Sequence, residues 1–369
     1  MMLKRIYIHN FRCFSNFELS VDAISLFLGP NGSGKSTVFD ALRKLRQFIN
    51  ADKKVAALFT PDDLTHWDKS PKQAFELEIQ GNGGTYKYEL AIAHDEMREH
   101  SWVDHERLWF DKSLLLNFEG GEARFFNDDH SKGPTYPSEP FSSLLSSLPP
   151  RRDNTRLTWF RERMRRFIIV QLNPMMMSGT SAREESELNP GAENFVSWYR
   201  HISHNQGTIA EIASEIKELM AGFRYFRFAK VGERQHLLHV CFSKETDGRD
   251  GVEYRFDRLS DGQRALIALY SMIHHAKSQD YTLCMDEPEN FLALPEIQPW
   301  IIRLWDICND NDLQALLISH HPEYINYLAS SAGWWFYRDS NMPVRVRRIT
   351  EEEDGVSVSE LVARGWIDE

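Results

Sequence analysis

The sequence has few cysteines, no long apolar run and no excess of basic residues. Its four cysteines, Cys13, Cys241, Cys284 and Cys308, are scattered and form no C-x-x-C pair, so we expect neither a disulfide framework nor a zinc site. No apolar segment approaches the ~18 residues that a membrane-spanning helix needs. The start of the chain, MMLKRIYIHNF, alternates like a strand and lacks the features of a signal peptide. We therefore expect a cytoplasmic protein without a membrane contact.

Acidic residues outnumber basic ones. The 369-residue chain has 54 Asp and Glu against 43 Lys and Arg, which gives a formal net charge of −11. Because nucleic-acid binding needs a positive surface, any such contact has to be local. Apolar residues make up 42% of the chain and charged residues 26%, as in globular proteins, and the length predicts two or three domain-sized lobes.

The order of the predicted elements indicates an α/β fold. Apolar and β-branched runs between turn signals predict strands, and amphipathic runs predict helices. Residues 127–155 are rich in Pro, Ser and Asp and predict a long loop or mobile segment. Strands and helices alternate from residue 281 onward, which predicts a parallel core. The expected strands are 3–8, 24–28, 74–80, 86–93, 167–172, 224–230, 237–242, 253–258, 281–286, 314–319 and 334–338. The expected helices are 36–50, an arginine-rich helix between residue 155 and the strand at 167–172, and then 192–204, 208–220, 262–277, 295–308 and 322–329.

A glycine-rich motif follows the predicted strand at 24–28. The segment Gly29-Pro-Asn-Gly-Ser-Gly-Lys-Ser-Thr37 fits the phosphate-binding pattern G-x-x-x-x-G-K-[ST] in full, and it opens a predicted helix. Backbone N–H groups in such a loop and the helix N-terminus favour bound phosphate. We expect Lys35 to reach the β- and γ-phosphates and Ser36 to ligate Mg²⁺. The predicted nucleotide contacts of the motif are Asn31, Gly32, Ser33, Gly34, Lys35, Ser36 and Thr37.

A second motif is an apolar strand that ends in two acids, Asp286 and Glu287, within YTLCMDEPE. In a chain that also has a phosphate-binding loop, this pattern is a Walker B motif. We expect Asp286 to hold Mg²⁺ and Glu287 to orient and activate the attacking water. A carboxylate suits that role because phosphoryl transfer needs mainly positioning and electrostatics.

The segment Leu259-Ser-Asp-Gly-Gln263 lies between these two motifs, just before an apolar helix. This order resembles that of ABC-type ATPases, and of their SMC/RecF/OLD-like branch in particular. The resemblance implies ATP as the nucleotide and a head-to-head homodimer. In such a dimer Ser260, Gly262 and Gln263 would face the γ-phosphate held by the second copy. Ser260 and Gln263 also fit a helix capping box, which is compatible with that role.

The resemblance suggests three further contacts. His320 ends the apolar strand of LLISHHP and resembles the switch histidine that contacts the γ-phosphate. Arg12, in NFRCF, resembles a residue of SMC/RecF-type heads that touches the nucleotide. Gln171, after the apolar strand segment Phe167–Val170, is the candidate for the Q-loop ligand of the metal, and an ordinary buried or surface glutamine is the alternative.

The spacing of the motifs indicates which branch the chain resembles. Lys35 and Asp286 are 251 positions apart, so insertions separate them, and no heptad run predicts a coiled-coil arm. We expect an ABC-type P-loop NTPase head with a mixed sheet, inserted β-hairpins and a small helical lobe. The expected parts are an N-terminal ATPase lobe at 1–126, an inserted mobile and helical part at 127–252, and a C-terminal ATPase lobe at 253–369.

Two departures from the relatives stand out. The segment from Glu289 to Pro295 has an extra residue and no histidine where many relatives have E-x-x-L-H-P, which puts the dimer contacts of this loop in doubt. Only 49 residues follow His320, too few for the TOPRIM nuclease domain of OLD proteins. We therefore expect any nuclease to be a separate effector protein.

An arginine-rich stretch at Arg151–Arg166 is the main candidate for a further contact. It has seven arginines against Asp153 and Glu162, with two aromatic residues between them. Such a stretch suits DNA backbone contact or an acidic partner, whereas charge runs on helices are commonly solvated faces. Three functions stay open: an ATPase that gates an effector in bacterial anti-phage defence, a RecF-like DNA-repair ATPase, and a nucleotide-gated scaffold with little turnover.

Overall fold

The computed structural model describes residues 1–349 except 52, 96, 98–99, 244–250, 278 and 311. The chain forms two compact units, which we call unit 1 (Met1–Phe167 with Ile325–Glu369) and unit 2 (Ile168–Tyr324). Their boundaries differ from the predicted parts 1–126, 127–252 and 253–369. That three-part division stays a prediction, and residues 350–369 of its last part lie outside the described residues.

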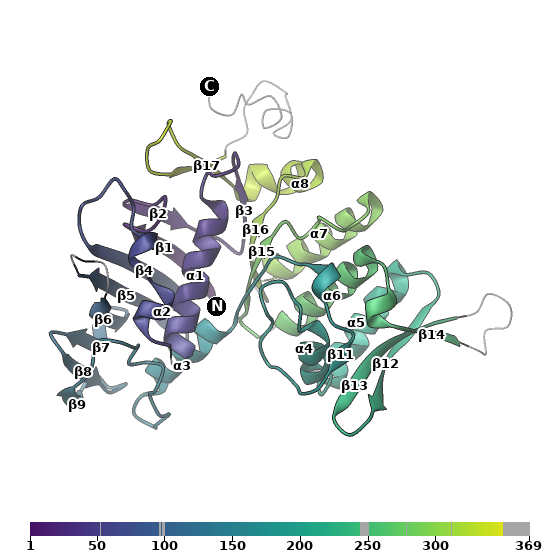
Figure 1. The fold of residues 1–369 in the computed structure, drawn as a ribbon, viewed down its shortest axis with the longest axis horizontal. Helices are drawn as coiled ribbons and strands as arrows, with labels where there is room; N and C mark the ends of the chain where they lie inside the picture. The colour runs from purple at the N-terminus through teal and green to yellow at the C-terminus, as the bar shows by residue number, and fades with distance from the viewer. Residues whose placement is uncertain are drawn as a thin grey trace. The chain divides into compact units, whose positions relative to one another are not determined.

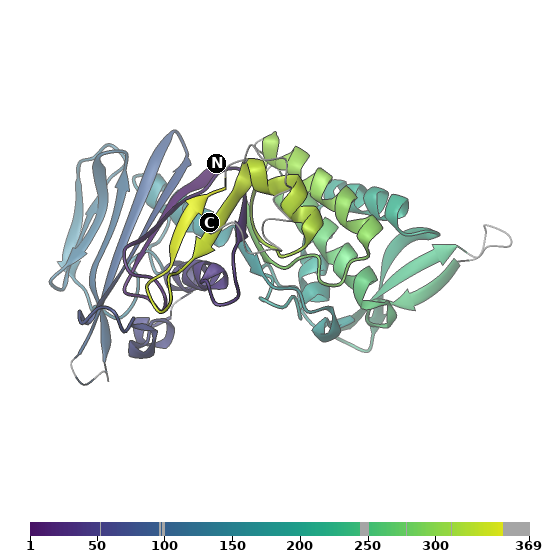
Figure 2. The ribbon, with the colours of Figure 1, turned by 90° about the horizontal axis from the view of Figure 1, so that it is seen from above.

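Unit 1 is built around a large antiparallel sheet, whose long strands run side by side in Figure 2. In the described residues its order is β2-β1-β4-β5-β6-β7-β8-β9. The predicted hairpin at 74–93 is confirmed, because Asn82 and Gly83 both have positive φ, 49° and 85°, as a tight two-residue turn requires. The strands are β1 (Met2–His9), β2 (Phe17–Ser20), β4 (Lys72–Gly81), β5 (Gly84–His94), β6 (Ser101–Phe110), β7 (Ser113–Glu119), β8 (Glu122–Phe126) and β9 (Lys132–Pro137).

The edge strand β9 corrects the prediction of a loop or mobile segment at 127–155. It pairs with β8, and the following helix α3 (Thr155–Arg165) begins at the end of the same segment. Pro134 and Pro137 hide the strand in the sequence, because proline lacks the N–H that an inner strand must donate. At a sheet edge that donor is not needed on the outer side, so proline is tolerated there.

A second group of strands in unit 1 carries the phosphate-binding loop. β17 (Gly333–Tyr337) runs parallel to β3 (Ile24–Leu28) and antiparallel to β18 (Arg345–Arg348). Helix α1 (Lys35–Asn50) follows β3, and the rings of Phe27 and Phe39 join the two elements with centroids 5.8 Å apart. The short helix α2 (Val55–Leu58) comes next, and α8 (Pro322–Ala332) leads into β17. The predicted strand, loop and helix at 24–50 are thus confirmed.

Among its described residues, unit 2 contains a parallel strand pair, a small antiparallel sheet and several helices (Figure 1). β15 (Thr282–Asp286) and β16 (Gln314–Ile318) run parallel, and β10 (Phe167–Val170) lies beside β15. The predicted strand at 253–258 is shorter than expected, because a 3-10 turn begins at Phe256. The antiparallel strands are β11 (Thr180–Ser181), β12 (Phe223–Val231), β13 (Gln235–Ser243) and β14 (Gly251–Arg255), and the helices are α4 (Phe195–Ile202), α5 (Gln206–Leu219), α6 (Asp261–Ala276) and α7 (Leu294–Asn309).

The chain is an α/β protein with mixed sheets, as the sequence predicted. Helix α6 is buried along most of its length, from Ala265 to Ala276, and it packs against α4, α5 and α7. None of the described helices is both long enough and apolar enough to cross a bilayer.

Candidate nucleotide-binding site

The phosphate-binding loop of unit 1 has a backbone that requires glycine at two positions. Gly29 has φ 139°, and a Cβ there would lie 2.1 Å from the carbonyl oxygen of Phe336. Gly34 has φ 90°, and a Cβ there would lie 2.9 Å from Cys13 Sγ. Both contacts are shorter than real Cβ atoms allow. Positive φ and close packing together therefore explain the glycines of the motif.

Lys35 lies at the start of α1 and is held by the loop itself. Its side chain is buried, and Nζ donates to the carbonyl oxygens of Gly29 and Pro30 at 2.7 and 2.9 Å. Gly34 caps the helix without a side-chain hydrogen bond, and no acid occupies the first turn. Ser36 and Thr37 lie in that turn. The helix N-terminus therefore keeps its positive character, which suits an anion such as phosphate.

Arg12 is tied to α1 through two carboxylates. Its Nη1 donates to Asp40 at 2.6 Å and its Nε donates to Asp63 at 2.8 Å. Partial burial alone would lower the pKa of Arg12, but the hydrogen bonds that it donates to Asp63 and Asp40 raise this pKa overall. The side chain is 38% exposed. The structure thus gives Arg12 a role in holding the P-loop helix, and its predicted contact with nucleotide stays a prediction.

In unit 2 the Walker B acids and the switch histidine lie at the same ends of two parallel strands. Asp286 ends β15 opposite Ile318 of β16. The backbone N–H of Glu287 donates to the Ile318 oxygen at 2.8 Å, which holds Glu287 against the end of β16. Its Oε1 is 3.9 Å from His320 Nε2. The fold therefore brings together Glu287 and His320, which are 33 positions apart in the chain.

Glu287 is oriented by a neighbour that the sequence did not single out. Asn290 Nδ2 donates to Glu287 Oε2 at 2.8 Å. Glu287 also has φ 48°, an uncommon backbone conformation for a residue other than glycine. Strained backbone of this kind clusters at functional sites. Both features fix where the carboxylate lies, as a water-positioning residue requires.

A third acid, Glu289, connects the Walker B segment with the segment that carries His320. Glu289 is 6% exposed, and it accepts a hydrogen bond from the Ser319 hydroxyl. Ser319 Oγ in turn accepts from the backbone N–H of His321 at 3.0 Å. Burial raises the pKa of Glu289 to about 7, Ser319 opposes the rise, and the nearby Glu287 and Asp286 add to it. In the sequence, only weak signals pointed to this contact: the acid Glu289 directly after the DEP segment, and Ser319 directly before the two histidines.

The segment Leu259–Gln263, which resembles a motif of ABC-type ATPases, contains the capped start of α6. Ser260 Oγ accepts from the Gln263 N–H at 3.2 Å, and the Gln263 side chain accepts from the Ser260 N–H at 3.1 Å. This confirms the predicted capping box. Ser260 is exposed. A Cβ on Gly262 would lie 2.8 Å from the Phe291 oxygen, so glycine lets α6 approach the segment that follows Walker B.

Three residues are predicted to hold the metal, namely Ser36, Asp286 and Gln171. Asp286 and Ser36 are oxygen donors at the ends of their motifs, whereas Gln171 is exposed just after β10. In the described part of the chain no cluster of three His, Cys, Asp or Glu side chains forms a metal site. The roles of these three residues stay predictions.

The arginine-rich stretch is only partly on the surface. Arg161 and Arg163 are buried, and Arg161 Nη1 donates to the Leu148 oxygen at 2.6 Å. Arg163 lies over the Phe167 ring, and Arg156 lies over the Phe110 ring with its guanidinium carbon 4.1 Å from the centroid. These three arginines stabilise the packing of α3. Contact with DNA or an acidic partner through this stretch stays a prediction, and its exposed arginines are Arg151, Arg152 and Arg165.

The fold and the motifs define a class, the ABC-type P-loop ATPases of the SMC/RecF/OLD-like branch. The chain belongs to the family described as "AAA domain, putative AbiEii toxin, Type IV TA system", whose model matches residues 24–326. It is similar to an OLD nuclease of Thermus scotoductus, with 31% identity over 109 residues that cover 24% of this chain and 20% of the relative. The match thus spans about a fifth of that relative.

Two solved structures are similar to this chain. One is the SMC head domain from Thermotoga maritima, at a TM-score of 0.49 and 14% identity, with 95% of this chain and 100% of that chain covered. The other is an SMC head bound to the C-terminal winged-helix domain of ScpA, at a TM-score of 0.54 and 12% identity, with 95% and 98% covered. At this identity the second likeness supports the fold of the SMC head and no more.

Proposed function

We propose that this chain binds ATP with Mg²⁺ and hydrolyses it to ADP and phosphate. The observation that carries the proposal is the arrangement of Glu287, which Asn290 orients and which lies 3.9 Å from His320 Nε2. A fixed carboxylate can position and activate the attacking water. A nearby histidine can contact the terminal phosphate, and phosphoryl transfer is catalysed mainly by such positioning.

The remaining motif residues have roles in holding the nucleotide. Lys35 exchanges its loop carbonyls for phosphate oxygens, and the N-terminus of α1 adds its partial positive charge. Ser36 and Asp286 would hold Mg²⁺, which would neutralise charge on the phosphates. Asn31, Gly32, Ser33, Gly34 and Thr37 supply backbone or side-chain contacts around them. His320 senses the terminal phosphate.

The test is the substitution Glu287→Gln, which keeps the size of the side chain and removes its negative charge. We expect phosphate release to fall by at least about 100-fold, as for loss of a positioned base, while MgATP still binds. Glu323→Gln is the matched control, since Glu323 is another acid of unit 2 that accepts a side-chain hydrogen bond. Turnover at the wild-type rate in Glu287→Gln would show that another residue activates the water.

Dimerisation around two nucleotides is part of the same proposal. The support is the exposed Ser260 at the N-terminus of α6, which offers a hydroxyl and a helix end to an anion. Ser260→Arg should abolish turnover and ATP-dependent dimerisation, measured by phosphate release and light scattering. Asn205→Arg is the control, because Asn205 also caps a helix by accepting from an N–H. Equal effects of the two variants would indicate only lost capping.

We further propose that the ATP-bound dimer gates a separate effector, a nuclease, in anti-phage defence. The family description includes a putative toxin, and one relative is named a nuclease. Cells that carry the chain with its neighbouring gene should resist phage, and Glu287→Gln should remove that resistance. Resistance that survives Glu287→Gln argues for the third function, a nucleotide-gated scaffold.

The RecF-like alternative depends on DNA contact by the chain itself. The exposed Arg151, Arg152 and Arg165 support it, whereas the burial of Arg161 and Arg163 weakens it. Its test is ATP-dependent binding of DNA that weakens as salt rises. Loss of that binding in Arg152→Ala with Arg165→Ala would favour this function over effector gating.

A further inference from the structure

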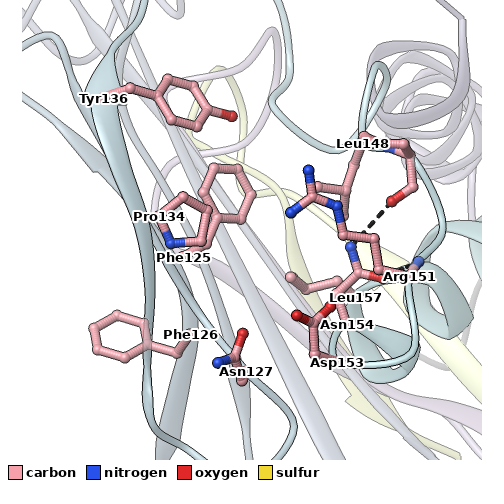
Figure 3. A pocket seen from close by; sticks show the side chains of 11 residues that line it. Phe125, Phe126, Asn127, Pro134, Tyr136, Leu148, Arg151, Asp153, Asn154 and Leu157 are labelled. Atoms are coloured by element: carbon pink, nitrogen blue, oxygen red, sulfur yellow. Dashed lines mark hydrogen bonds between the residues drawn. The ribbon is translucent and has the colours of Figure 1, made fainter.

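A cavity of about 320 Å³ lies in unit 1 and shares no residue with the phosphate-binding loop. Figure 3 shows it between the strands β8 and β9 on one side and the segment before α3 on the other. Its volume is at the lower end of the range for small-ligand pockets, roughly 300–1,000 Å³. The strand wall presents the rings of Phe125 and Tyr136 together with Pro134, and the opposite wall presents leucines, an arginine and an aspartate.

The aromatic wall is a flat stacking surface. Phe125 and Tyr136 are stacked on each other, with ring centroids 5.7 Å apart and planes inclined by 24°. Pro134 lies on the same wall (Figure 3). Phe125 is buried, whereas Tyr136 is 43% exposed. The pair therefore offers an accessible tyrosine ring that is supported by a buried phenylalanine ring. Such a rigid aromatic surface can stack on a planar group at low entropic cost.

The polar groups of the cavity carry both signs of charge. The guanidinium of Arg151 points into the cavity towards Phe125 and Tyr136 (Figure 3), and in the described part of the chain it makes no hydrogen bond or ion pair. The Asp153 carboxylate lies below it, also without a side-chain partner among the described residues. The cavity thus has an uncommitted donor and an uncommitted acceptor next to a stacking surface.

The segment that presents these two side chains is held rigidly. The backbone N–H of Arg151 donates to Asn154 Oδ1 at 2.8 Å, and Asn154 Nδ2 donates to the Pro149 oxygen at 3.1 Å. Asn154 itself is buried. The backbone oxygen of Asp153 accepts from the Asp128 N–H at 2.8 Å. The pocket is therefore largely preformed.

The edge strand β9 does not favour a peptide that adds a strand. Pro134 and Pro137 lack an N–H, and prolines on an edge strand block pairing with another chain. A ligand here has to insert a group into the cavity instead. A simple anion would suit Arg151 but not Asp153, and a simple cation would suit Asp153 but not Arg151. A neutral planar ring with donors and acceptors on its edge suits both.

We propose that this cavity binds an unpaired nucleobase, stacked on Tyr136 and Phe125 and read by Arg151 and Asp153. Arginine donates to base acceptors, a carboxylate accepts from base amino or imino groups, and aromatic stacking tolerates every base. The base can come from a free nucleoside or from a single-stranded nucleic acid. The proposal is independent of ATP hydrolysis, because the cavity and the phosphate-binding loop are separate.

The test uses the full chain and two probes. Nucleosides lack the phosphates that the P-loop recognises, and short fluorescent single strands report binding by anisotropy. We expect Tyr136→Ala to weaken binding of the responding probe roughly tenfold, the typical effect of losing one stacked base, and Tyr136→Phe to retain it. Arg151→Ala should weaken binding as well. Tyr254→Ala is the control, since Tyr254 is an exposed tyrosine that also packs on a phenylalanine.

The two probes separate the sources of the base. Binding of both probes with the Tyr136→Ala loss supports a site for free nucleosides and strands alike. Binding of single strands alone, with a duplex of the same sequence unable to compete, supports a nucleic-acid site. The proposal is overturned if neither probe binds, if Tyr136→Ala leaves binding unchanged, or if an aromatic peptide binds the cavity in place of both probes.

Discussion

The phosphate-binding loop and the Walker B region differ in the sign of the charge that each has to accommodate. In the loop a buried cation, Lys35, is satisfied by backbone oxygens of Gly29 and Pro30. In the Walker B region Asp286, Glu287 and Glu289 gather near one strand end, and their mutual repulsion contributes to the raised pKa of Glu289. The loop is shaped by the backbone, whereas the Walker B region is shaped by side-chain hydrogen bonds. Changes of charge should therefore affect the two regions differently.

The largest expected effect is on nucleotide affinity in Lys35→Ala. The substitution removes the cation that we place on the phosphates, and hydrogen bonds to charged groups contribute about 1.5–3 kcal/mol each. Two such bonds correspond to an affinity loss of roughly 100-fold or more. Titration of the chain with MgATP measures this. The control is Lys54→Ala, at an exposed lysine, which should leave the affinity for MgATP unchanged. An unchanged affinity in Lys35→Ala would show that the loop does not hold the nucleotide.

The next effect is on stability and depends on pH. The pKa of Glu289 is about 7 in the folded chain, compared with an ordinary value of 4.5. Burial disfavours the charged carboxylate, and the nearby carboxylates of Glu287 and Asp286 add to this effect, whereas the hydrogen bond from Ser319 opposes it. A raised carboxyl pKa stabilises the fold below the unfolded pKa. That stability is lost as pH rises from about 4.5 to about 7.

The variant Glu289→Gln stays neutral and isolates this contribution. Relative to the variant, the free energy of unfolding of the wild-type chain should fall by on the order of 3 kcal/mol between about pH 5 and about pH 8. Denaturant titrations at both pH values measure the difference. Tyr324, which is buried and interacts electrostatically with Glu289, stays neutral in this range. Parallel pH profiles for the wild-type chain and Glu289→Gln would contradict the prediction.

The smallest effect compares two glycines of the same loop. Gly34→Ala adds a Cβ at φ 90° that meets Cys13 Sγ at 2.9 Å, whereas Gly32→Ala adds one at φ 79° with no atom within 4 Å. Backbone strain alone costs about 1–2 kcal/mol. We expect that loss in Gly32→Ala and an additional ~1 kcal/mol in Gly34→Ala from the close contact. Thermal unfolding measures both, and equal losses would show that Cys13 moves aside freely.

The parts of the site that could be predicted from the sequence are those formed by contiguous segments of the chain. The P-loop, the capping box at Ser260 and Gln263, and the acids after β15 each depend on neighbours within a few residues. The strands at 24–28, 281–286 and 314–319 were predictable for the same reason, because each is a short apolar run followed by turn or polar residues. The turn residues Asn82 and Gly83 between β4 and β5 are another local signal.

The remaining features depend on residues that are distant in the chain. The edge strand β9 contains two prolines and becomes a strand only because β8 supplies hydrogen bonds on one side. Arg161 and Arg163 carry charge, yet they are buried because carbonyl oxygens and an aromatic ring lie where α3 packs. Local patterns report propensity and charge, and they do not report which partner will cover a side chain.

The sequence by itself determined the class of this protein, since loop and strand-end chemistry resides in short motifs whose backbone conformation is set by glycine and by adjacent apolar runs. Only the tertiary structure decided that Glu289 shares a hydrogen bond with Ser319, that Glu287 lies beside His320, and that Tyr136 and Arg151 face one cavity. The physical reason is that burial, pKa and cavity shape arise from atoms that meet across the fold. No local sequence pattern encodes these contacts between residues that are distant in the chain.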